Sequence, residues 1–312
     1  MLDLKTKKIL VTGASGFLGT HARAALKARG VEDDSIVAPT RKTYDFRERS
    51  ACAEAVKGVD VVLHLAGVTG NTEFHKSEPA RTYYDNLIMG VYLMETARAA
   101  GVQKFVTIGS ATEYPERAPL PFREDDLWIG PLEADHAPYT VAKKMLSVQS
   151  RAYSEQYGFR AVHLIMTNMY GPGENVESGV FIPTLIKKVL EAKANSLSAV
   201  EMHGNGDATR DFIYVKDAAE AICLAAEKGE RPDPINIASG WEISVRELAG
   251  IVKDIAGFEG TITFSPRAGG QPRRVLDTTR ARVLLGFQAQ TDFRTGIEET
   301  IKDFSARMRI SP

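Results

Sequence analysis

KILVTGASGFLG (residues 8–19) places a short apolar run directly before a glycine-rich turn and the start of a helical pattern. Glycines let the backbone turn sharply and let its N–H groups approach a pyrophosphate, and a helix N-terminus adds partial positive charge. An ordinary glycine-rich turn would look the same, but the position after the first strand favours a dinucleotide-phosphate loop. The loop residues that we expect to contact the cofactor are Gly13, Ser15, Gly16, Phe17, Leu18 and Gly19.

Outward from this loop, short apolar runs alternate with helix-length segments. Strands are predicted at 8–12, 36–38, 59–66, 105–108 and 161–166, and helices at 17–29, 47–57, 81–100 and 139–157. Short apolar strands separated by helices indicate a parallel sheet covered on both faces, with right-handed crossovers. We therefore predict an α/β fold with a doubly wound, Rossmann-type parallel sheet that binds its ligands at the carboxyl ends of the strands.

The regular alternation ends after residue 168. Glycines surround one predicted helix (181–194), and a strand at 235–238, a helix at 244–256 and a helical region from residue 278 follow. Residues 211–228 resemble a return to the sheet. The predicted division is therefore discontinuous. Residues 1–169 with 210–239 form the dinucleotide-binding domain, and residues 170–209 with 240–312 form a smaller C-terminal α/β substrate lobe.

The overall composition excludes several kinds of partner. The 312 residues carry a formal net charge of −1, so no excess of charge points to nucleic acid or to an anionic membrane. No apolar run approaches the roughly 20 residues that a bilayer span needs, and no signal peptide is visible. The two cysteines, Cys52 and Cys223, form no metal-type cluster and fit a reducing compartment. We expect a cytoplasmic protein without a bound metal.

PTRK (39–42), after the second predicted strand, bears on the choice of cofactor. Enzymes that use NAD usually place an Asp or Glu here to bind the ribose 2′-hydroxyl. Arg41 instead suits a 2′-phosphate, because a guanidinium forms forked hydrogen bonds with phosphate oxygens, and Thr40 can add a hydroxyl. The other interpretation is a pair of solvated basic residues on a loop. We predict NADP as the cofactor, with NAD as the alternative.

YTVAK (139–143) puts a phenol and an ammonium four residues apart, on one face of a helix. An unperturbed Tyr has a pKa of about 10, and a nearby cation lowers it. Tyr139 can then exchange a proton with a sugar hydroxyl, while Lys143 also holds the nicotinamide ribose. Ser110, after the fourth predicted strand, is expected to hydrogen-bond the substrate oxygen. Alone, the pair also fits a surface aromatic beside a solvated Lys.

Six motifs now carry a resemblance to a known family. They are TGASGFLG (12–19), HLAG (64–67), GSATEYP (109–115), YTVAK (139–143), TNMYGPG (167–173) and RDFIYVKDAAEA (210–221). Together they resemble the extended short-chain dehydrogenase/reductase family, in its NAD-dependent epimerase/dehydratase group, along nearly the whole chain. GPLEADHAPYTVAKK (130–144), VFIPTLIKK (180–188) and PRRVLD (272–277) are similar to its GDP-L-fucose synthase-like subgroup. The resemblance implies a Rossmann core and a nucleotide-diphosphate sugar held by the C-terminal lobe.

The resemblance also assigns residues to the two ligands. For the cofactor it implies Asp45 at the adenine, and contacts from Phe46, Leu65, Ala66, Gly67 and Asn86. Simple packing at a strand end would equally explain Ala66 and Gly67. For the sugar nucleotide it implies Arg210 at the diphosphate, and Asn168, Phe181, Lys188 and Arg274 around the rest of the ligand. A structural ion pair with Asp211 is the other interpretation of Arg210.

The departures from the subgroup restrict the chemistry. Its double epimerisation uses a Cys two positions after the active-site Ser and a His before the VFIP segment, where this chain has Thr112 and Val180. Neither side chain can exchange protons beside a ketone near neutrality. The Asp–Glu pair of the related dehydratases is replaced by Ala111 and Thr112, and Glu113 enters the site only after a shift of one residue. The reaction that remains possible is hydride transfer at a single carbinol centre, most simply at carbon 4 of the sugar.

Three functions stay open at this point. The first is an NADP-dependent reductase of a nucleotide-diphosphate 4-keto-6-deoxy sugar, with Tyr139 as proton donor and Ser110, Thr112 and Lys143 beside it. The second is a 4-epimerase with tightly bound NAD, since SATEYP also resembles UDP-glucose 4-epimerase. A non-catalytic dinucleotide binder is the third, and the intact Ser, Tyr and Lys argue against it. The family also implies a homodimer through helices 81–100 and 139–157, although burial within the monomer explains their apolar faces equally well.

Overall fold

The computed structural model describes residues 1–204, 206–265 and 271–310. The remaining positions all fall in the segments assigned above to the smaller lobe. A six-stranded parallel sheet occupies one half of the molecule, in the order β10-β5-β4-β3-β1-β2. Its strands are β1 (Ile9–Thr12), β2 (Ile36–Val37), β3 (Val61–His64), β4 (Lys104–Ser110), β5 (Ala161–Met166) and β10 (Ile235–Ile237).

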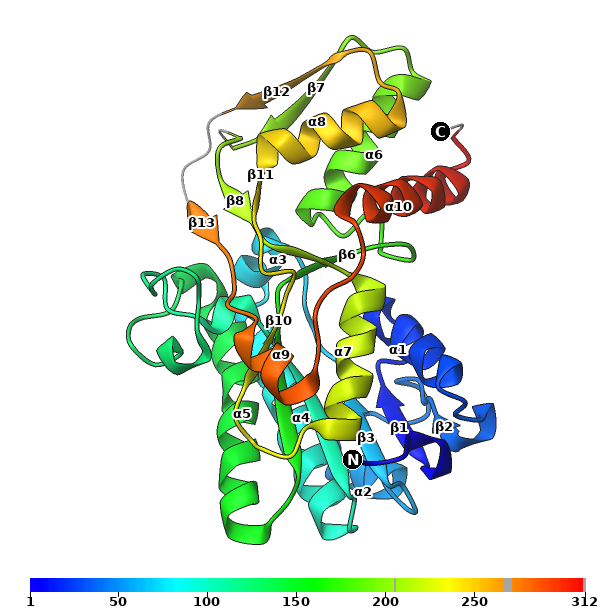
Figure 1. The fold of residues 1–312 in the computed structure, drawn as a ribbon, viewed down its shortest axis with the longest axis vertical. Coiled ribbons are helices and arrows are strands. Elements are labelled where there is room, and N and C mark those ends of the chain that lie inside the picture. The colour runs from blue at the N-terminus through cyan, green and yellow to red at the C-terminus, as the bar shows by residue number, and fades with distance from the viewer. Residues whose placement is uncertain (205, 266–270, 311–312) are drawn as a thin grey trace.

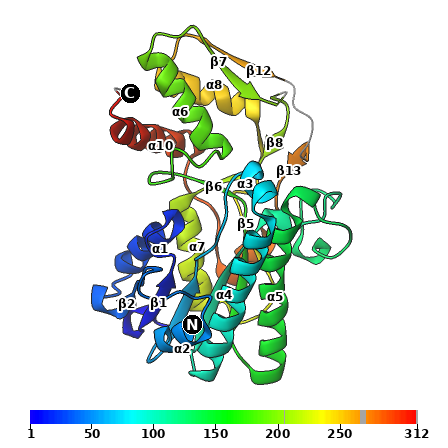
Figure 2. The same ribbon diagram turned by 180° about the vertical axis from the view of Figure 1, so that it is seen from behind.

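Helices cover both faces of this sheet, which confirms the predicted doubly wound α/β fold. One face carries α2 (Arg49–Ala55), α4 (Pro79–Ala99) and α5 (Ala137–Tyr157), and the other carries α1 (Phe17–Ala28) and α7 (Val215–Lys228). Figures 1 and 2 show these two layers from opposite sides. Both α4 and α5 begin with a proline in the first turn, where its missing N–H costs no hydrogen bond. The strands β2 and β3 lie on opposite sides of β1, so the strand order changes direction at β1. A ligand-binding crevice is expected at such a topological switch point.

A second half of the molecule lies beyond the carboxyl ends of the strands (Figure 1). It contains α6 (Phe181–Ala194), α8 (Val245–Ala256), α10 (Phe293–Met308), and the paired strands β7 (Ala199–His203) and β12 (Thr261–Ser265). These elements share their own hydrophobic cluster, which includes Leu185, Leu248 and Phe304. The sequence analysis predicted the helices but not β7 and β12, although glycines at 204 and 206 follow β7 and glycines at 257 and 260 precede β12.

Short strands connect the two halves. They are β6 (Asn168–Tyr170) with β9 (Phe212–Tyr214), and β8 (Thr209–Arg210) between β11 (Ile243–Ser244) and β13 (Arg273–Arg274). The helix α9 (Thr279–Leu285) was assigned to the smaller lobe, yet it packs against α7 and β10, and Ala281 and Leu285 belong to the core of the sheet. The two-lobe division stays a proposal, and this packing favours placing α9 in the dinucleotide domain.

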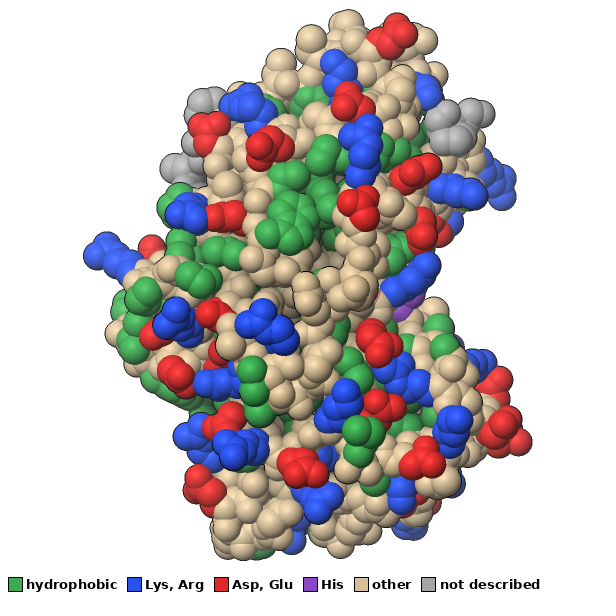
Figure 3. Space-filling view, in the orientation of Figure 1, with side chains coloured by type: hydrophobic (Ala, Val, Ile, Leu, Met, Phe, Trp, Pro, Cys, Tyr) green, Lys and Arg blue, Asp and Glu red, His purple; other side chains and the backbone are tan. Residues whose placement is uncertain are grey.

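Several short elements lie on the loops. They are α3 (Thr72–Ser77) and the single turns η1 (Leu4–Thr6), η2 (Asp33–Ser35), η3 (Ala111–Glu113), η4 (Glu124–Asp126) and η5 (Ala134–His136). None of the helices in the described ranges has the length and apolar character that a bilayer span requires. On the face drawn in Figure 3, Lys and Arg side chains are interspersed with Asp and Glu over both halves.

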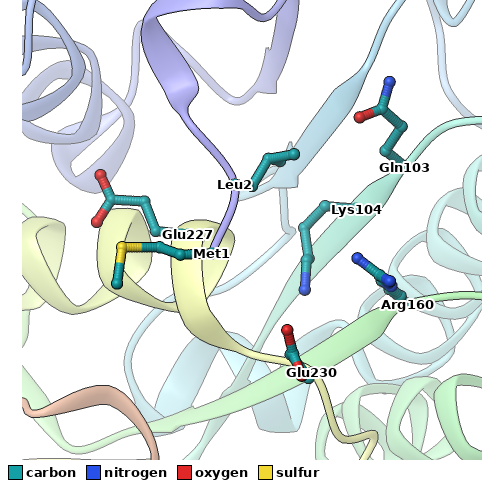
Figure 4. Close-up of a pocket in the computed structure, with 7 residues that line it drawn as sticks. All are labelled: Met1, Leu2, Gln103, Lys104, Arg160, Glu227 and Glu230. Atoms are coloured by element: carbon teal, nitrogen blue, oxygen red, sulfur yellow. The ribbon is translucent and has the colours of Figure 1, made fainter.

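A small hollow of about 50 Å³ lies at the amino ends of the strands, opposite the crevice. In Figure 4, Lys104 of β4 extends into it from among Arg160, Glu230 and neighbouring residues. The Lys104 ammonium donates to the carbonyl of Gly229, and burial lowers its pKa to about 8. Since parallel sheets bind ligands at the carboxyl ends of their strands, this hollow is not the predicted site.

Candidate active site

The glycine-rich turn after β1 is shaped by contacts that no larger residue would allow. Gly13 has a φ of +67°, and a Cβ there would lie 2.9 Å from the Cα of Ala66 on the loop after β3. A Cβ at Gly19 would lie only 2.1 Å from the carbonyl oxygen of Gly13. The first turn of α1 therefore lies directly against the loop, and the Gly16 N–H closes this loop by donating to the Gly13 carbonyl at 2.9 Å. Ser15 and Gly16 are exposed, and the N–H groups of the first helical turn have no acceptor within the helix. This cradle fits a dinucleotide pyrophosphate.

We expect Gly19→Ala to destabilise the protein by about 1–3 kcal/mol and to abolish dinucleotide binding. The added methyl group meets main-chain atoms, which cannot move aside as a flexible side chain can. Gly250→Ala in α8 is the matched control, because a Cβ there meets nothing within 4 Å. Thermal unfolding and dinucleotide fluorescence measure the two effects. Wild-type dinucleotide affinity in Gly19→Ala would contradict the close-approach argument.

The loop after β3 is held in place by buried polar side chains. The Thr12 hydroxyl contacts Nδ1 of His64 at 3.0 Å and accepts a hydrogen bond from the N–H of Ala66 at 3.0 Å. Asn86 of α4 is buried, and its amide accepts from Val68 N–H at 3.0 Å and donates to the Val68 carbonyl at 2.8 Å. Asn86, predicted as a cofactor residue, thus also shapes the loop that carries Ala66 and Gly67.

The residues expected to bind the adenosine half of the cofactor differ in their exposure and in their contacts. Arg41 is exposed and lies 3.9 Å from the carboxylate of Asp45. Asp45 is held by Arg47, whose Nε donates to it at 2.9 Å, and this hydrogen bond lowers the pKa of Asp45 to about 2. The Phe46 side chain is buried in the core between the sheet and α2, and Leu65 is half-buried at the end of β3.

Tyr139 and Lys143 lie one turn apart on α5, and both are buried. A Cβ at Gly67 would come within 3.2 Å of the Lys143 Nζ, so the ammonium faces the loop after β3. Burial raises the pKa of Tyr139 to about 12, partly offset by a hydrogen bond with the Thr69 hydroxyl. Burial likewise lowers the pKa of Lys143 to about 8. The predicted lowering of the tyrosine pKa is therefore wrong for this structure, because desolvation outweighs the nearby cation.

Two hydroxyl groups follow the end of β4. The Thr112 hydroxyl donates to Oγ of Ser110 at 3.0 Å, and Ser110 Oγ also accepts from the N–H of Thr112. Both residues are half-buried. Glu113 does not share this orientation, because its carboxylate folds back into the core against His163. A shift of one residue in the alignment would have placed Glu113 in the site. The structure does not have this arrangement, since the Glu113 carboxylate faces the core.

A histidine that the sequence analysis overlooked packs against the tyrosine. His75, on α3, is buried with its ring centroid 4.8 Å from that of Tyr139 and 5.1 Å from that of His136. Lys76 and Asp135 form an ion pair at 3.0 Å between the same two segments. The turn η5 and the helix α3 therefore cover Tyr139 from the side of the smaller lobe.

Two arginines lie side by side across the crevice. Arg210 and Arg274 are register partners on the parallel strands β8 and β13. Burial lowers the pKa of Arg210 to about 10, and the positive charge of Arg274 lowers it further. Glu133, from the loop before α5, lies 3.3 Å from Arg274 and balances part of this charge. Two partly desolvated arginines at neighbouring register positions suit a dianion such as a diphosphate.

Asp211 does not neutralise Arg210, contrary to the ion-pair interpretation. The Asp211 carboxylate accepts hydrogen bonds from the N–H and hydroxyl of Ser239 at 3.0 Å and 2.7 Å, and from the N–H of Gly240 at 3.2 Å. Burial raises its pKa to about 6 against these hydrogen bonds. Asp211 therefore fixes the loop after β10 beneath the arginine pair. The ion pair with Asp211 was the alternative interpretation of Arg210, and the contacts of Asp211 do not support it.

The other predicted substrate residues, Asn168, Phe181 and Lys188, make contacts with other parts of the protein. The Asn168 amide donates to the carbonyl of Asp211 at 3.1 Å. Phe181 begins α6 and packs against the cluster of the smaller lobe. The Lys188 ammonium donates to the carbonyl of Glu201 at 2.8 Å, which joins α6 to β7. Glu133, Thr69 and His75 were missed, because their roles depend on contacts between segments distant in sequence.

Comparison with known proteins agrees with this geometry. The model of the NAD dependent epimerase/dehydratase family matches residues 9–238. A GDP-L-fucose synthase from Sinorhizobium fredii is 32% identical over 309 residues, covering 97% of this chain and 97% of the relative. A dTDP-4-dehydro-6-deoxy-D-allose reductase from Streptomyces bikiniensis is 30% identical over 325 residues, covering 97% and 98%.

This chain also resembles a solved structure in its three-dimensional fold. A GDP-mannoheptose C4 reductase from Campylobacter jejuni, with NADP bound, superposes with a TM-score of 0.88 at 25% identity, covering 98% of this chain and 100% of that one. Most of this chain matches the family model, and its likeness to curated relatives runs along nearly its whole length. The chain belongs to the NAD dependent epimerase/dehydratase family.

Proposed function

We propose that the protein is an NADP-dependent reductase of a nucleotide-diphosphate 4-keto-6-deoxy sugar, acting at carbon 4. The observation that carries this proposal is a chain of contacts that joins the arginine pair to Tyr139. Arg274 lies 3.3 Å from Glu133, Glu133 lies 3.6 Å from His136, and the rings of His136, His75 and Tyr139 pack in series. Tyr139 and Lys143 suit reduction of a ketone, and the arginine pair suits a diphosphate. Relatives named as a GDP-L-fucose synthase and as a 4-dehydro-6-deoxy-sugar reductase support the substrate class.

The side chains of this protein perform the proton chemistry. A reduced nicotinamide, bound with its pyrophosphate on the loop after β1, supplies the hydride. Tyr139 gives its proton to the oxygen that becomes the carbon 4 hydroxyl, and its raised pKa of about 12 keeps it protonated before that step. Ser110 Oγ accepts from the Thr112 hydroxyl and N–H, so the Ser110 hydroxyl can donate its own proton to the same substrate oxygen and stabilise the developing negative charge. Lys143 holds the nicotinamide ribose from below the Gly67 loop.

Reduction without epimerisation is the outcome that the side chains favour. Thr112 stands two residues after Ser110, and Val180 precedes α6, so neither position supplies an acid or base for proton exchange beside a ketone. A 4-epimerase would retain its dinucleotide through the catalytic cycle. The exposed Arg41, at the open edge of the cofactor site, suits a dinucleotide that is exchanged at every turnover.

Incubating the purified protein with NADPH and a panel of nucleotide-linked 4-keto-6-deoxy sugars tests the proposal. We expect loss of NADPH absorbance with at least one GDP- or dTDP-linked ketone, and a product reduced at carbon 4 with carbons 3 and 5 unchanged by NMR. Co-purified oxidised dinucleotide, together with interconversion of UDP-glucose and UDP-galactose, would replace this proposal with the epimerase.

We expect Arg41→Ala to weaken NADPH binding by about 10- to 100-fold, the effect of losing one or two charge-assisted hydrogen bonds. Binding of NADH should stay unchanged, because only the 2′-phosphate distinguishes the two cofactors. The exposed Lys42→Ala is the matched control for loss of positive charge on the same loop. Equal weakening of NADPH and NADH would place the 2′-phosphate elsewhere.

We also propose a homodimer through α4 and α5. These two helices pack against each other on the outside of the sheet. Their outer surface exposes Tyr83 at 40%, Tyr84 at 59% and Val148 at 45%, which is apolar surface that a second copy would cover. Sedimentation analysis tests the association, and a monomer at micromolar concentration would oppose it.

A further inference from the structure

A buried carboxylate lies directly behind the hydride site, on the core side of Ser110. Glu113 ends η3, and its Oε1 accepts a hydrogen bond from the main-chain N–H of Ser110 at 2.9 Å. Gly109 leaves the room for this arrangement, because a Cβ there would lie 2.1 Å from Oε1 of Glu113. Glu113 has no exposed surface, and a fully buried carboxylate is rare unless it is paired.

The hydrogen-bond partner of the Glu113 carboxylate is a buried histidine. Nε2 of His163, on β5, lies 3.1 Å and 3.2 Å from the two carboxylate oxygens, while Nδ1 is buried without a partner. An N–H at Nδ1 would thus lack an acceptor, which is costly in the interior. The tautomer that leaves no donor unpaired carries its proton on Nε2. His163 therefore donates to the Glu113 carboxylate and orients it.

This charge acts on groups that line the site from α5. The positive groups are Lys143 and Lys144, both buried, and the negative charge of Glu113 raises their pKa values against the lowering by burial. The Lys144 ammonium also donates to the main-chain carbonyl of Glu113 at 3.2 Å. The remaining titratable groups that respond are Tyr139 and Tyr114, whose pKa values the same charge raises.

We propose that Glu113, oriented by His163, is a positioning residue of the hydride site. It fixes the main chain of Ser110, and with it the Ser110–Thr112 hydroxyl pair. Because η3 packs against α5, where the Lys144 ammonium donates to the Glu113 carbonyl, Glu113 also places its carboxylate beside the helix that carries Lys143. The catalytic consequence of this role rests on the proposed reductase function, whereas the electrostatic consequence does not.

Glu113→Gln tests both parts of the proposal. The amide keeps nearly the same volume but loses the charge, and the pKa of Lys143 should fall by about one unit. Activity that requires the protonated Lys143 is lost as the pH rises through its pKa of about 8. In the variant that loss should therefore begin at a lower pH. We expect kcat at neutral pH to fall by about 10- to 100-fold, with an unchanged KM for the sugar nucleotide.

Glu124→Gln is the matched control. Glu124 is another buried carboxylate on the neighbouring turn η4, and it accepts a main-chain N–H, that of Asn236, at 2.9 Å. The pH profile and the Lys143 titration should stay as in wild type. If Glu113→Gln has the wild-type pH profile and the wild-type Lys143 pKa, Glu113 is merely structural and the proposal is wrong, however much activity is lost.

Two further measurements keep the test decisive. Glu113→Asp retains the charge but withdraws the carboxylate from the Ser110 N–H, so it should lower kcat without moving the Lys143 pKa. Wild-type kcat in this variant would overturn the positioning role. The Lys143 pKa is read directly by NMR of 13Cε-labelled lysine, which needs no substrate. If the wild-type protein reduced none of the sugars, the proposed function would fail, while the NMR titration would still decide the electrostatic part.

Discussion

Replacing Tyr139 with Phe is expected to lower kcat by about 10²- to 10⁴-fold, the usual contribution of a positioned acid. The phenol lies at the buried end of the crevice, and its raised pKa of about 12 keeps it in the proton-donating form at neutral pH. The KM for the sugar nucleotide should change little, because the arginine pair that we propose as the diphosphate site is untouched. Steady-state oxidation of NADPH measures both constants.

The fold should survive this change. Phe preserves the ring contact with His75, whose centroid lies 4.8 Å from that of Tyr139. Tyr153→Phe, on the outer part of the same helix, is the control, because Tyr153 packs against Tyr157 and Phe159 rather than against the crevice. Turnover of Tyr139→Phe at the wild-type rate would end the assignment of the hydride chemistry to this site.

Arg210→Met is expected to raise the KM for the sugar nucleotide by about 10- to 100-fold, the effect of losing one or two hydrogen bonds to a charged group. The thermal stability should not fall, and we expect it to rise slightly. The pKa of Arg210 is lowered to about 10 by burial and by the charge of Arg274, so the unliganded protein holds two repelling cations at this place. Removing one of them relieves that repulsion and weakens the diphosphate site at the same time.

Arg273→Met separates this effect from a general loss of positive charge. Arg273 is adjacent to Arg274 in β13, but its side chain is 56% exposed and pairs with Glu242. Its loss should leave the KM within error of wild type. Calorimetry with GDP and dTDP measures the same difference without turnover. An Arg210→Met protein that bound both diphosphates at wild-type affinity would move the diphosphate site away from β8 and β13.

Local sequence signals were sufficient where one segment decides the structure. KILVTGASGFLG predicted β1, the turn and the start of α1, because apolar run, glycine spacing and helix start are all encoded within twelve residues. The helix of Tyr139 and Lys143 was predicted for the same reason, since a spacing of four residues places two side chains on one helical face. The sheet and its covering on both faces followed from the repeated alternation.

The arrangement of Glu113 illustrates what local signals could not supply. The residues GSATEYP are equally compatible with a carboxylate in the crevice and with one in the core. The choice depends on His163, 50 residues away on the next strand, which offers the buried carboxylate a donor. The short helix α3 was missed as well, although Asn71 caps its N-terminus and Glu73 lies in its first turn. Its contacts with η5 and Tyr139 join segments far apart in the sequence, which no local signal shows.

The sequence by itself determined the phosphate loop and the pairing of Tyr139 with Lys143, since each depends on residues close together in the chain. It also determined the parallel sheet, because apolar runs and helix-length segments alternate along the chain. Only the tertiary structure decided the pKa of Tyr139, the meeting of Arg210 with Arg274 and the inward orientation of Glu113. The physical reason is that burial and charge contacts are properties of the folded environment. A titratable group responds to every element packed around it, and the chain order does not state which elements those are.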